Sequence, residues 1–241
     1  MIKVTVFCEY AEFHKTYPDV INAYPNGIHS CLGEIFSDAG FETTIIPYSE
    51  GDDGSSLTDE ILQETDVLVW WGHILHEQIS ELVVEKVCAH VYAGMGCIFL
   101  HSAHMAKPFK RLMGTTCSLS WREIGEKEKL WVVSPNHPIT QGISECIEID
   151  HEEMYGEFFD IPKPEELIFL GWFQGGEVFR SGVTYTRGNG KIFYFQPGHE
   201  TNPTYHNEKI KQILINSIYW AKTEKRAIPE CRHVPKTLEE L

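Results

Sequence analysis

Cys97-Ile98-Phe99-Leu100-His101-Ser102-Ala103-His104 is the stretch that decides the fold. Its apolar half is typical of a buried strand, which ends abruptly in three polar side chains, His101, Ser102 and His104. We expect a helix over Ala103–Met113 directly after it. Ligands of open parallel sheets bind beyond the carboxyl ends of the strands. The stretch therefore predicts an α/β fold with a polar binding site at this strand end.

Strands and helices alternate through the first 114 residues. Parallel strands covered on both faces read as near-continuous apolar runs, which here predict strands at Ile2–Cys8, Phe41–Pro47 and Asp66–Trp71. Apolar residues at helical spacing predict intervening helices at Gly27–Ala39, Leu57–Gln63 and Glu77–Ala93. This order favours a parallel sheet with right-handed crossover connections.

Beyond residue 115 short strands replace the strand–helix units. Two are predicted at Ser118–Ile124 and Leu130–Val133, joined by a charged turn at residues 125–128, and two more at 145–150 and 166–171. A hairpin signal, Arg187-Gly188-Asn189-Gly190, separates strands at Val178–Tyr185 and Lys191–Phe195. Apolar spacing over Ile210–Ala221 predicts a closing amphipathic helix.

We interpret the chain as one three-layer α/β/α domain with a mostly parallel sheet and antiparallel extensions. The parallel core covers about 1–114 and 186–223, the antiparallel insertion about 115–185, and a C-terminal arm 224–241. The insertion and the arm exceed what a minimal doubly wound domain needs. We therefore expect a homo-oligomer, with the arm on the surface or on another subunit.

Composition excludes several classes of partner. A formal charge of −15 argues against nucleic acid and anionic membranes, because both attract basic patches. No apolar run reaches the length of about 18 residues that a membrane span needs, and Met1 leads directly into a strand, so we expect a cytoplasmic protein. The seven scattered cysteines contain no CxxC pair, which indicates neither a disulfide framework nor a cysteine zinc site.

Histidines and carboxylates gather where predicted strands end. Imidazole suits both proton transfer and metal binding, and a buried glutamate can act as acid or base. The candidate catalytic residues are His101, His199, Glu153 and Glu200. The candidate substrate-binding residues are Ser102, His73, His104, Trp71, Tyr155 and Glu157.

Two further roles are weighed for this cluster. A nucleophilic Ser102 is disfavoured, because Leu100 and His104 stand where a nucleophile elbow needs small residues. His73, His101 and His199 are candidate ligands of zinc or another divalent metal. No HExxH spacing is present, so separate loops would have to assemble such a site.

Four segments resemble the ThuA family of trehalose utilization proteins: Leu68–His73, Phe99–His104, His151–Glu157 and Gly190–Glu200. The resemblance runs through nearly the whole chain in the expected order. It implies a flavodoxin-like core of the class I glutamine amidotransferase type. Amidotransferases of that type carry a cysteine at the strand-end turn, where this chain has His101-Ser102, so glutamine hydrolysis is not expected.

The resemblance also implies a place in disaccharide catabolism, with a small sugar as substrate and a functional link to an oxidoreductase that makes 3-keto sugars. The first hypothesis is acid/base isomerisation, elimination or hydrolysis of a keto-sugar or keto-disaccharide. Two alternatives stay open: a non-catalytic sugar-binding or regulatory protein, and a metal-dependent hydrolase.

Overall fold

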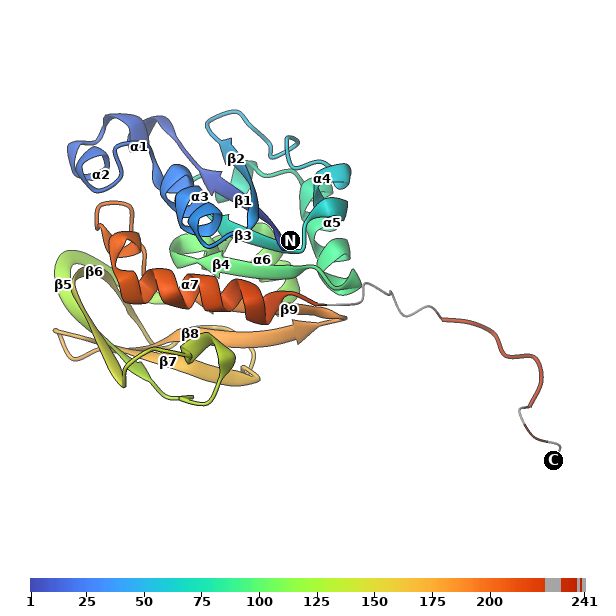
Figure 1. The fold of residues 1–241 in the computed structure, drawn as a ribbon. Coiled ribbons are helices and arrows are strands. Elements are labelled where there is room, and N and C mark those ends of the chain that lie inside the picture. The colour runs from blue at the N-terminus through green and yellow to red at the C-terminus, as the bar shows by residue number, and fades with distance from the viewer. Residues whose placement is uncertain (224–230, 238, 240–241) are drawn as a thin grey trace.

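The computed structural model describes residues 1–223, 231–237 and 239. The strands of this part of the chain form one nine-stranded sheet in the order β2-β1-β3-β4-β9-β8-β7-β5-β6 (Figure 1). From β2 to β9 all neighbours are parallel, and from β9 to β6 all are antiparallel. The fold is therefore mixed α/β, and β9 is the strand at which the two halves of the sheet meet.

The parallel half contains the predicted strand–helix units and, between residues 12 and 23, two short helices that the sequence did not predict. Its strands are β1 (Lys3–Glu9), β2 (Glu42–Tyr48), β3 (Val67–Trp71), β4 (Gly96–Leu100) and β9 (Gly190–Phe195). Its helices are α1 (Glu12–Thr16), α2 (Pro18–Ala23), α3 (Ile28–Asp38), α4 (Asp59–Glu64), α5 (Glu81–Ala93), α6 (Lys107–Met113) and α7 (Glu208–Ala221). Within the described residues, no helix combines the length and the apolar character needed to cross a membrane.

Helices cover both faces of the parallel half. Apolar residues of α4, α5 and α6 pack on one face, against Phe7, Trp70 and Phe99, while α3 and α7 cover the other. Gly96, at the start of β4, lets α7 approach closely, because a Cβ there would lie 2.5 Å from the carbonyl oxygen of Ala221. The central strands β3 and β4 are buried on both sides, which explains their continuous apolar sequence.

The antiparallel half corrects two predictions. Its strands are β5 (Ser120–Val132), β6 (Cys146–Gly156), β7 (Glu166–Phe173) and β8 (Val178–Arg187). The predicted strands at 118–124 and 130–133 are one strand, and the charged segment between them is an irregularity in its pairing with β6 rather than a turn. Gly125 supplies the positive φ of 71° that this irregularity contains. The strand predicted at 145–150 continues to Gly156, so His151–Glu153 lie within β6 and not after it.

Two predicted helices are also interrupted. The helix expected at 103–113 is a 3-10 turn, η2 (His101–Met105), followed by α6. Ala106 leaves the helical conformation, with ψ 132°, and α6 begins at Lys107 with Pro108 in its first turn. The helix expected at 77–93 begins as η1 (His76–Gln78), and α5 starts after the Ser80 cap. Short 3-10 turns also form at η3 (Pro138–Thr140) and η4 (Thr204–His206). Most of the predicted C-terminal arm lies outside the described residues, and its described residues 231–237 and 239 are exposed.

Candidate active site

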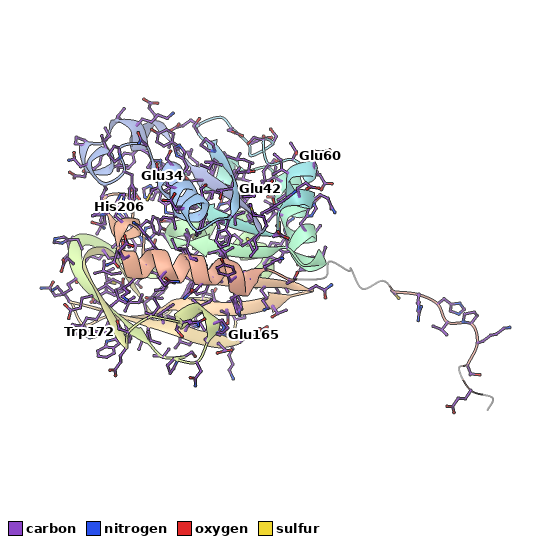
Figure 2. All side chains as sticks on the ribbon, in the orientation of Figure 1. Glu34, Glu42, Glu60, Glu165, Trp172 and His206 are labelled. Atoms are coloured by element: carbon purple, nitrogen blue, oxygen red, sulfur yellow. The ribbon has the colours of Figure 1, made fainter. Side chains whose placement is uncertain are left out.

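A cavity of about 440 Å³ lies at the carboxyl ends of β3, β4 and β9, where the antiparallel strands β5 and β6 form its opposite wall. It is lined by His73, Ile74, His76, Ser102, His104, Met105, Ser118, Leu119, Trp121, Glu123, Glu153, Tyr155 and His199. Six of the residues predicted from the sequence are among them. A second cavity, of about 320 Å³, lies between α3 and α7, where Glu34 and His206 border it (Figure 2). Its described lining includes none of the predicted site residues.

His101 lies directly behind the cavity wall, at the turn after β4. Its φ of +51° is a conformation that costs a non-glycine residue about 1–3 kcal/mol. Nδ1–H donates to the carbonyl oxygen of Gln196 at 2.9 Å, and Nε2 lies 3.1 Å from Oε2 of Glu153. Complete burial favours the neutral ring, but the hydrogen bond and charge of Glu153 outweigh it and raise the pKa of His101 to about 9. At neutral pH the two side chains form a buried ion pair.

His199 follows β9 and faces several carboxylates. Its Nδ1 lies 2.8 Å from the Thr201 hydroxyl, while Nε2 lies 3.6 Å from Oε1 of Glu200 and 3.9 Å from Oε2 of Glu153. Burial and the nearby charge of His101 lower the pKa of His199 to about 2, so the ring is neutral at physiological pH.

His73 and Glu200 form a second close pair, with Nδ1 and Oε1 3.3 Å apart. Burial lowers the pKa of His73 to about 3 and raises that of Glu200 to about 8. The loop that carries His73 is fixed by Glu9, which accepts its main-chain N–H at 2.7 Å and those of Ile74 and Leu75 at 3.0 Å. We call the part of the cavity lined by His73 and His199 its floor. The hydrogen bonds to Glu9 hold the His73 side of this floor in place.

Ser102, His104 and Tyr155 complete the polar lining. The Tyr155 hydroxyl lies 3.2 Å from that of Ser102 and 3.5 Å from Nε2 of His101. His104 donates through Nδ1 to the carbonyl oxygen of Cys117 at 2.7 Å. Burial lowers the pKa of His104 to about 3, so its neutral ring presents an Nε2 acceptor.

Two of the predicted substrate-binding residues, Trp71 and Glu157, are not part of the cavity lining. Trp71 is completely buried, and its indole N–H donates to the carbonyl oxygen of Gly198 at 3.1 Å, so it supports the β9 loop instead of contacting substrate. Glu157 lies beyond the end of β6 and forms an ion pair with Arg180 at 2.8 Å, away from the cavity lining. The tryptophan that does line the cavity is Trp121 on β5, 65% exposed. The sequence did not indicate this role for Trp121, because the strand that carries it was predicted to end at Ile124 in a turn.

Glu152 is a functional residue that the sequence did not reveal. It is completely buried next to Glu153 and accepts hydrogen bonds from the main chain of Gly198 at 2.9 Å and of His199 at 3.1 Å. It also accepts from the Thr204 hydroxyl at 2.8 Å. Glu152 thus ties β6 to the loop that carries His199. Because Glu152 and Glu153 are adjacent and identical, the sequence could not show which of them is buried as a structural link and which lines the cavity.

Three groups of residues in the described structure could each hold a metal ion, because the ligand atoms within each group lie within 4.8 Å of one another. They are Glu9–His14–His73, His73–His199–Glu200 and His101–Glu153–His199. The predicted metal ligands His73, His101 and His199 are thus divided between groups, each of which includes a carboxylate. The cavity and the residues directly behind its wall thus contain histidine and glutamate side chains of the kinds used in acid/base catalysis and in metal binding.

Comparison with known proteins agrees with the resemblance read from the motifs. The sequence profile of ThuA, trehalose utilisation, matches residues 3–221. The chain belongs to the ThuA family. No curated protein sequence matches the chain.

Solved structures repeat the fold of this ThuA protein. A ThuA-like protein from Parabacteroides merdae aligns with a TM-score of 0.70 at 17% identity, covering 98% of this chain and 93% of that one. A ThuA-like protein from Bacteroides uniformis gives 0.66 at 13%, covering 93% of both chains. A cytoplasmic protein from Salmonella typhimurium gives 0.59 at 14%, covering 92% of this chain and 100% of that one. At such identities the likeness concerns the fold alone.

Proposed function

We propose that this ThuA protein acts on a keto-sugar or keto-disaccharide by acid/base catalysis, in disaccharide breakdown. The observation that carries the proposal is the His101–Glu153 contact of 3.1 Å at the cavity wall. Glu153 lines the cavity, and His101 holds its carboxylate from behind. A carboxylate fixed in this way is a general base with a defined direction of attack.

A ketone makes the C–H bonds beside it acidic, which defines the step. Glu153 takes the proton from that carbon, the C–H electron pair forms a C=C bond, and the carbonyl π pair moves onto oxygen. The resulting enolate oxygen would be held by His73 and His199, which line the same cavity as Glu153. Isomerisation follows when that proton adds to the former carbonyl carbon while the hydroxyl on the deprotonated carbon gives its proton to the enolate oxygen, so that the ketone moves by one carbon. Loss of a protonated glycosidic oxygen from the next carbon instead eliminates the second sugar.

The shape of the cavity supports a small sugar as substrate. Its volume of about 440 Å³ falls within the usual range of small-molecule sites. Trp121, 65% exposed, gives the cavity a flat apolar face against which a sugar ring can lie. The family's description as trehalose utilisation supports the same substrate class, and an oxidoreductase that makes keto sugars would supply it.

We also infer that the parallel half is a flavodoxin-like core of the class I glutamine amidotransferase type. The order β2-β1-β3-β4-β9 supports this, because it repeats the flavodoxin order 2-1-3-4-5 with β9 as the fifth strand. The turn after β4 carries His101 and Ser102 in place of a cysteine, so the inference includes no glutaminase activity.

The test follows hydrogen exchange rather than a particular product. 3-Keto-trehalose is incubated with the protein in D₂O, and NMR records loss of the C–H signal beside the ketone. We expect exchange with the wild type and with Glu123→Gln, whose carboxylate borders the same cavity, and loss of exchange in Glu153→Gln. Binding without exchange by the wild type would indicate a non-catalytic sugar-binding protein. Equal exchange by the two variants would reject Glu153 as the base.

A further inference from the structure

We infer that His73, His199 and Glu200 form a binding site for one divalent transition-metal ion, such as Zn²⁺, on the floor of the cavity. Oε1 of Glu200 lies 3.3 Å from Nδ1 of His73 and 3.6 Å from Nε2 of His199. Zinc bonds of about 2.0–2.1 Å place neighbouring ligand atoms of a tetrahedral site about 3.3 Å apart. Both contacts of the Glu200 oxygen are close to this spacing, and one ligand atom from each of the three residues lies within 4.8 Å of the others. Two histidines with one glutamate are a known zinc ligand set.

One of the three ligand atoms and the second oxygen of the ligating carboxylate have no other partner in the part of the chain that the structure describes. Nδ1 of His73 and Oε2 of Glu200 are buried without a hydrogen-bond partner among the described residues. The 3.3 Å contact between His73 and Glu200 lacks hydrogen-bond alignment, so lone pairs on both remain available to a shared partner. An unsatisfied buried polar atom costs about 1–3 kcal/mol, and a cation bound by His73 and the Glu200 carboxylate would give Nδ1 a partner.

The surroundings orient these ligands as metal sites do. Metal-binding imidazoles commonly donate a hydrogen bond through their second nitrogen, and the Thr201 hydroxyl lies 2.8 Å from Nδ1 of His199. The Glu9 carboxylate fixes the loop of His73 by accepting a hydrogen bond from the main-chain N–H of His73 at 2.7 Å. His73 and His199 both line the cavity, so an ion held between them would keep a coordination position open toward substrate.

The two neighbouring groups are less suited to an ion. In the first, Glu9 already accepts hydrogen bonds from three main-chain amides, which occupy its oxygens. In the other, His101 and Glu153 are paired with each other at 3.1 Å, and Nδ1 of His101 is committed to a carbonyl. Of these three groups of described residues, His73–His199–Glu200 is the one that combines unpartnered buried atoms with a carboxylate that is not already held by three main-chain amides or by a protonated histidine.

The role of the ion, though not its binding, rests on the proposed function. An ion facing the cavity from His73 and His199 would bind the ketone oxygen as a Lewis acid, while Glu153, which lines the same cavity, acts as the base. The substrate would then be a sugar whose ketone oxygen reaches the floor while its ring lies against Trp121.

Metal binding is measured on the full chain after chelator treatment, without substrate, by titration with Zn²⁺ and with Co²⁺. We expect one ion per chain, with the intense visible absorption of tetrahedral Co²⁺. Affinity should fall more than about 100-fold in His73→Ala and Glu200→Gln, because each removes one of three ligands. His104→Ala is the matched control, since His104 lines the same cavity outside this group, and it should bind as the wild type does. Circular dichroism verifies that each variant folds.

Binding far below one ion per chain, or wild-type affinity in both ligand variants, would overturn the site. Should a ligand variant not fold, the Co²⁺ spectrum of the wild type decides, because octahedral absorption excludes this three-residue set with an open position. The D₂O exchange test separates the two proposals. A stoichiometric ion without exchange rejects the proposed function alone, and undiminished exchange by a chain that binds no ion rejects the metal site alone.

Discussion

The two halves of the sheet contribute to the cavity in different ways. The parallel half delivers His73 and His199 from short loops directly after β3 and β9, and His101 from a strained turn after β4. The antiparallel half delivers Glu153 and Tyr155 from within β6, two residues apart and so on one face of the strand. Strand ends thus gather imidazoles at one point, whereas strand interiors supply a wall with regular spacing. The proposed chemistry needs both, and His101–Glu153 is the contact where they meet.

Breaking that contact has the largest expected effect. His101→Asn and Glu153→Gln should each lower the rate of exchange beside the ketone by about 10²–10⁴-fold, the usual contribution of a positioned base. Because His101 acts through Glu153, the double variant should be no slower than the worse single one. Steady-state kinetics of the four proteins measures this. If the double variant lost activity by the product of the two single losses, His101 and Glu153 would act independently of each other.

A structural link between the halves gives the next effect. Glu152→Ala removes the buried acceptor of Gly198, His199 and Thr204, and should lower the free energy of unfolding by about 3 kcal/mol. Urea denaturation measures the loss. Glu148→Ala, on the exposed side of the same strand, is the control and should cost less than about 1 kcal/mol. Similar losses in both would show that β6 and the β9 loop are held by other contacts.

Protonation should destabilise the parallel half in particular. Burial lowers the pKa of His14 and His76 to about 4 and that of His104 to about 3. Below pH 6.5 the unfolded chain binds protons that the folded chain excludes, so the free energy of unfolding falls as the pH falls toward 4. Each group contributes about 1.4 kcal/mol per pH unit.

Urea denaturation of the metal-free protein at pH 7, 6 and 5 tests this expectation. His104→Asn removes one titrating group, so its stability should depend on pH less steeply than that of the wild type, by one proton. Identical slopes for the two proteins would mean that His104 titrates normally in the folded chain.

The smallest expected effect concerns the wall. Trp121→Ala should raise KM about fivefold with little change in kcat, because loss of a ring contact costs about 1 kcal/mol of binding shared by ground state and transition state. Trp172→Ala, a change of the same size on the outer face of β7, is the control (Figure 2). A fall in kcat in place of a rise in KM would give Trp121 a part in the chemistry.

The same contrast explains what the sequence could predict. Strands buried on both faces, such as β3 and β4, appear as apolar runs that end in polar residues, so their order and the histidines at their ends are readable. Because parallel strand ends share one edge, the meeting of His73, His101 and His199 could be predicted before any coordinates.

The strands of the antiparallel half were predicted less well, because they bury glutamate side chains. Glu126, Glu128 and Glu152 are almost completely buried within strands, although a run of charged residues normally indicates a loop. Hydrogen bonds make this possible: Glu126 pairs with Arg122 at 2.8 Å, and Glu128 accepts from Ser181 at 3.1 Å. Such partners are distant in sequence or hidden by the bulge, so neither the full length of β5 and β6 nor the part played by Glu152 could be foreseen.

The position of β9 has a consequence for how the chain is made. It pairs with β4 on one side and β8 on the other, yet it is the last strand to be synthesised. Until Gly190–Phe195 leave the ribosome, both neighbours present open edges that can pair with other chains. We therefore expect a nascent chain that stops before β9 to aggregate, and the two halves to join late, in a slow step set by contacts distant in sequence.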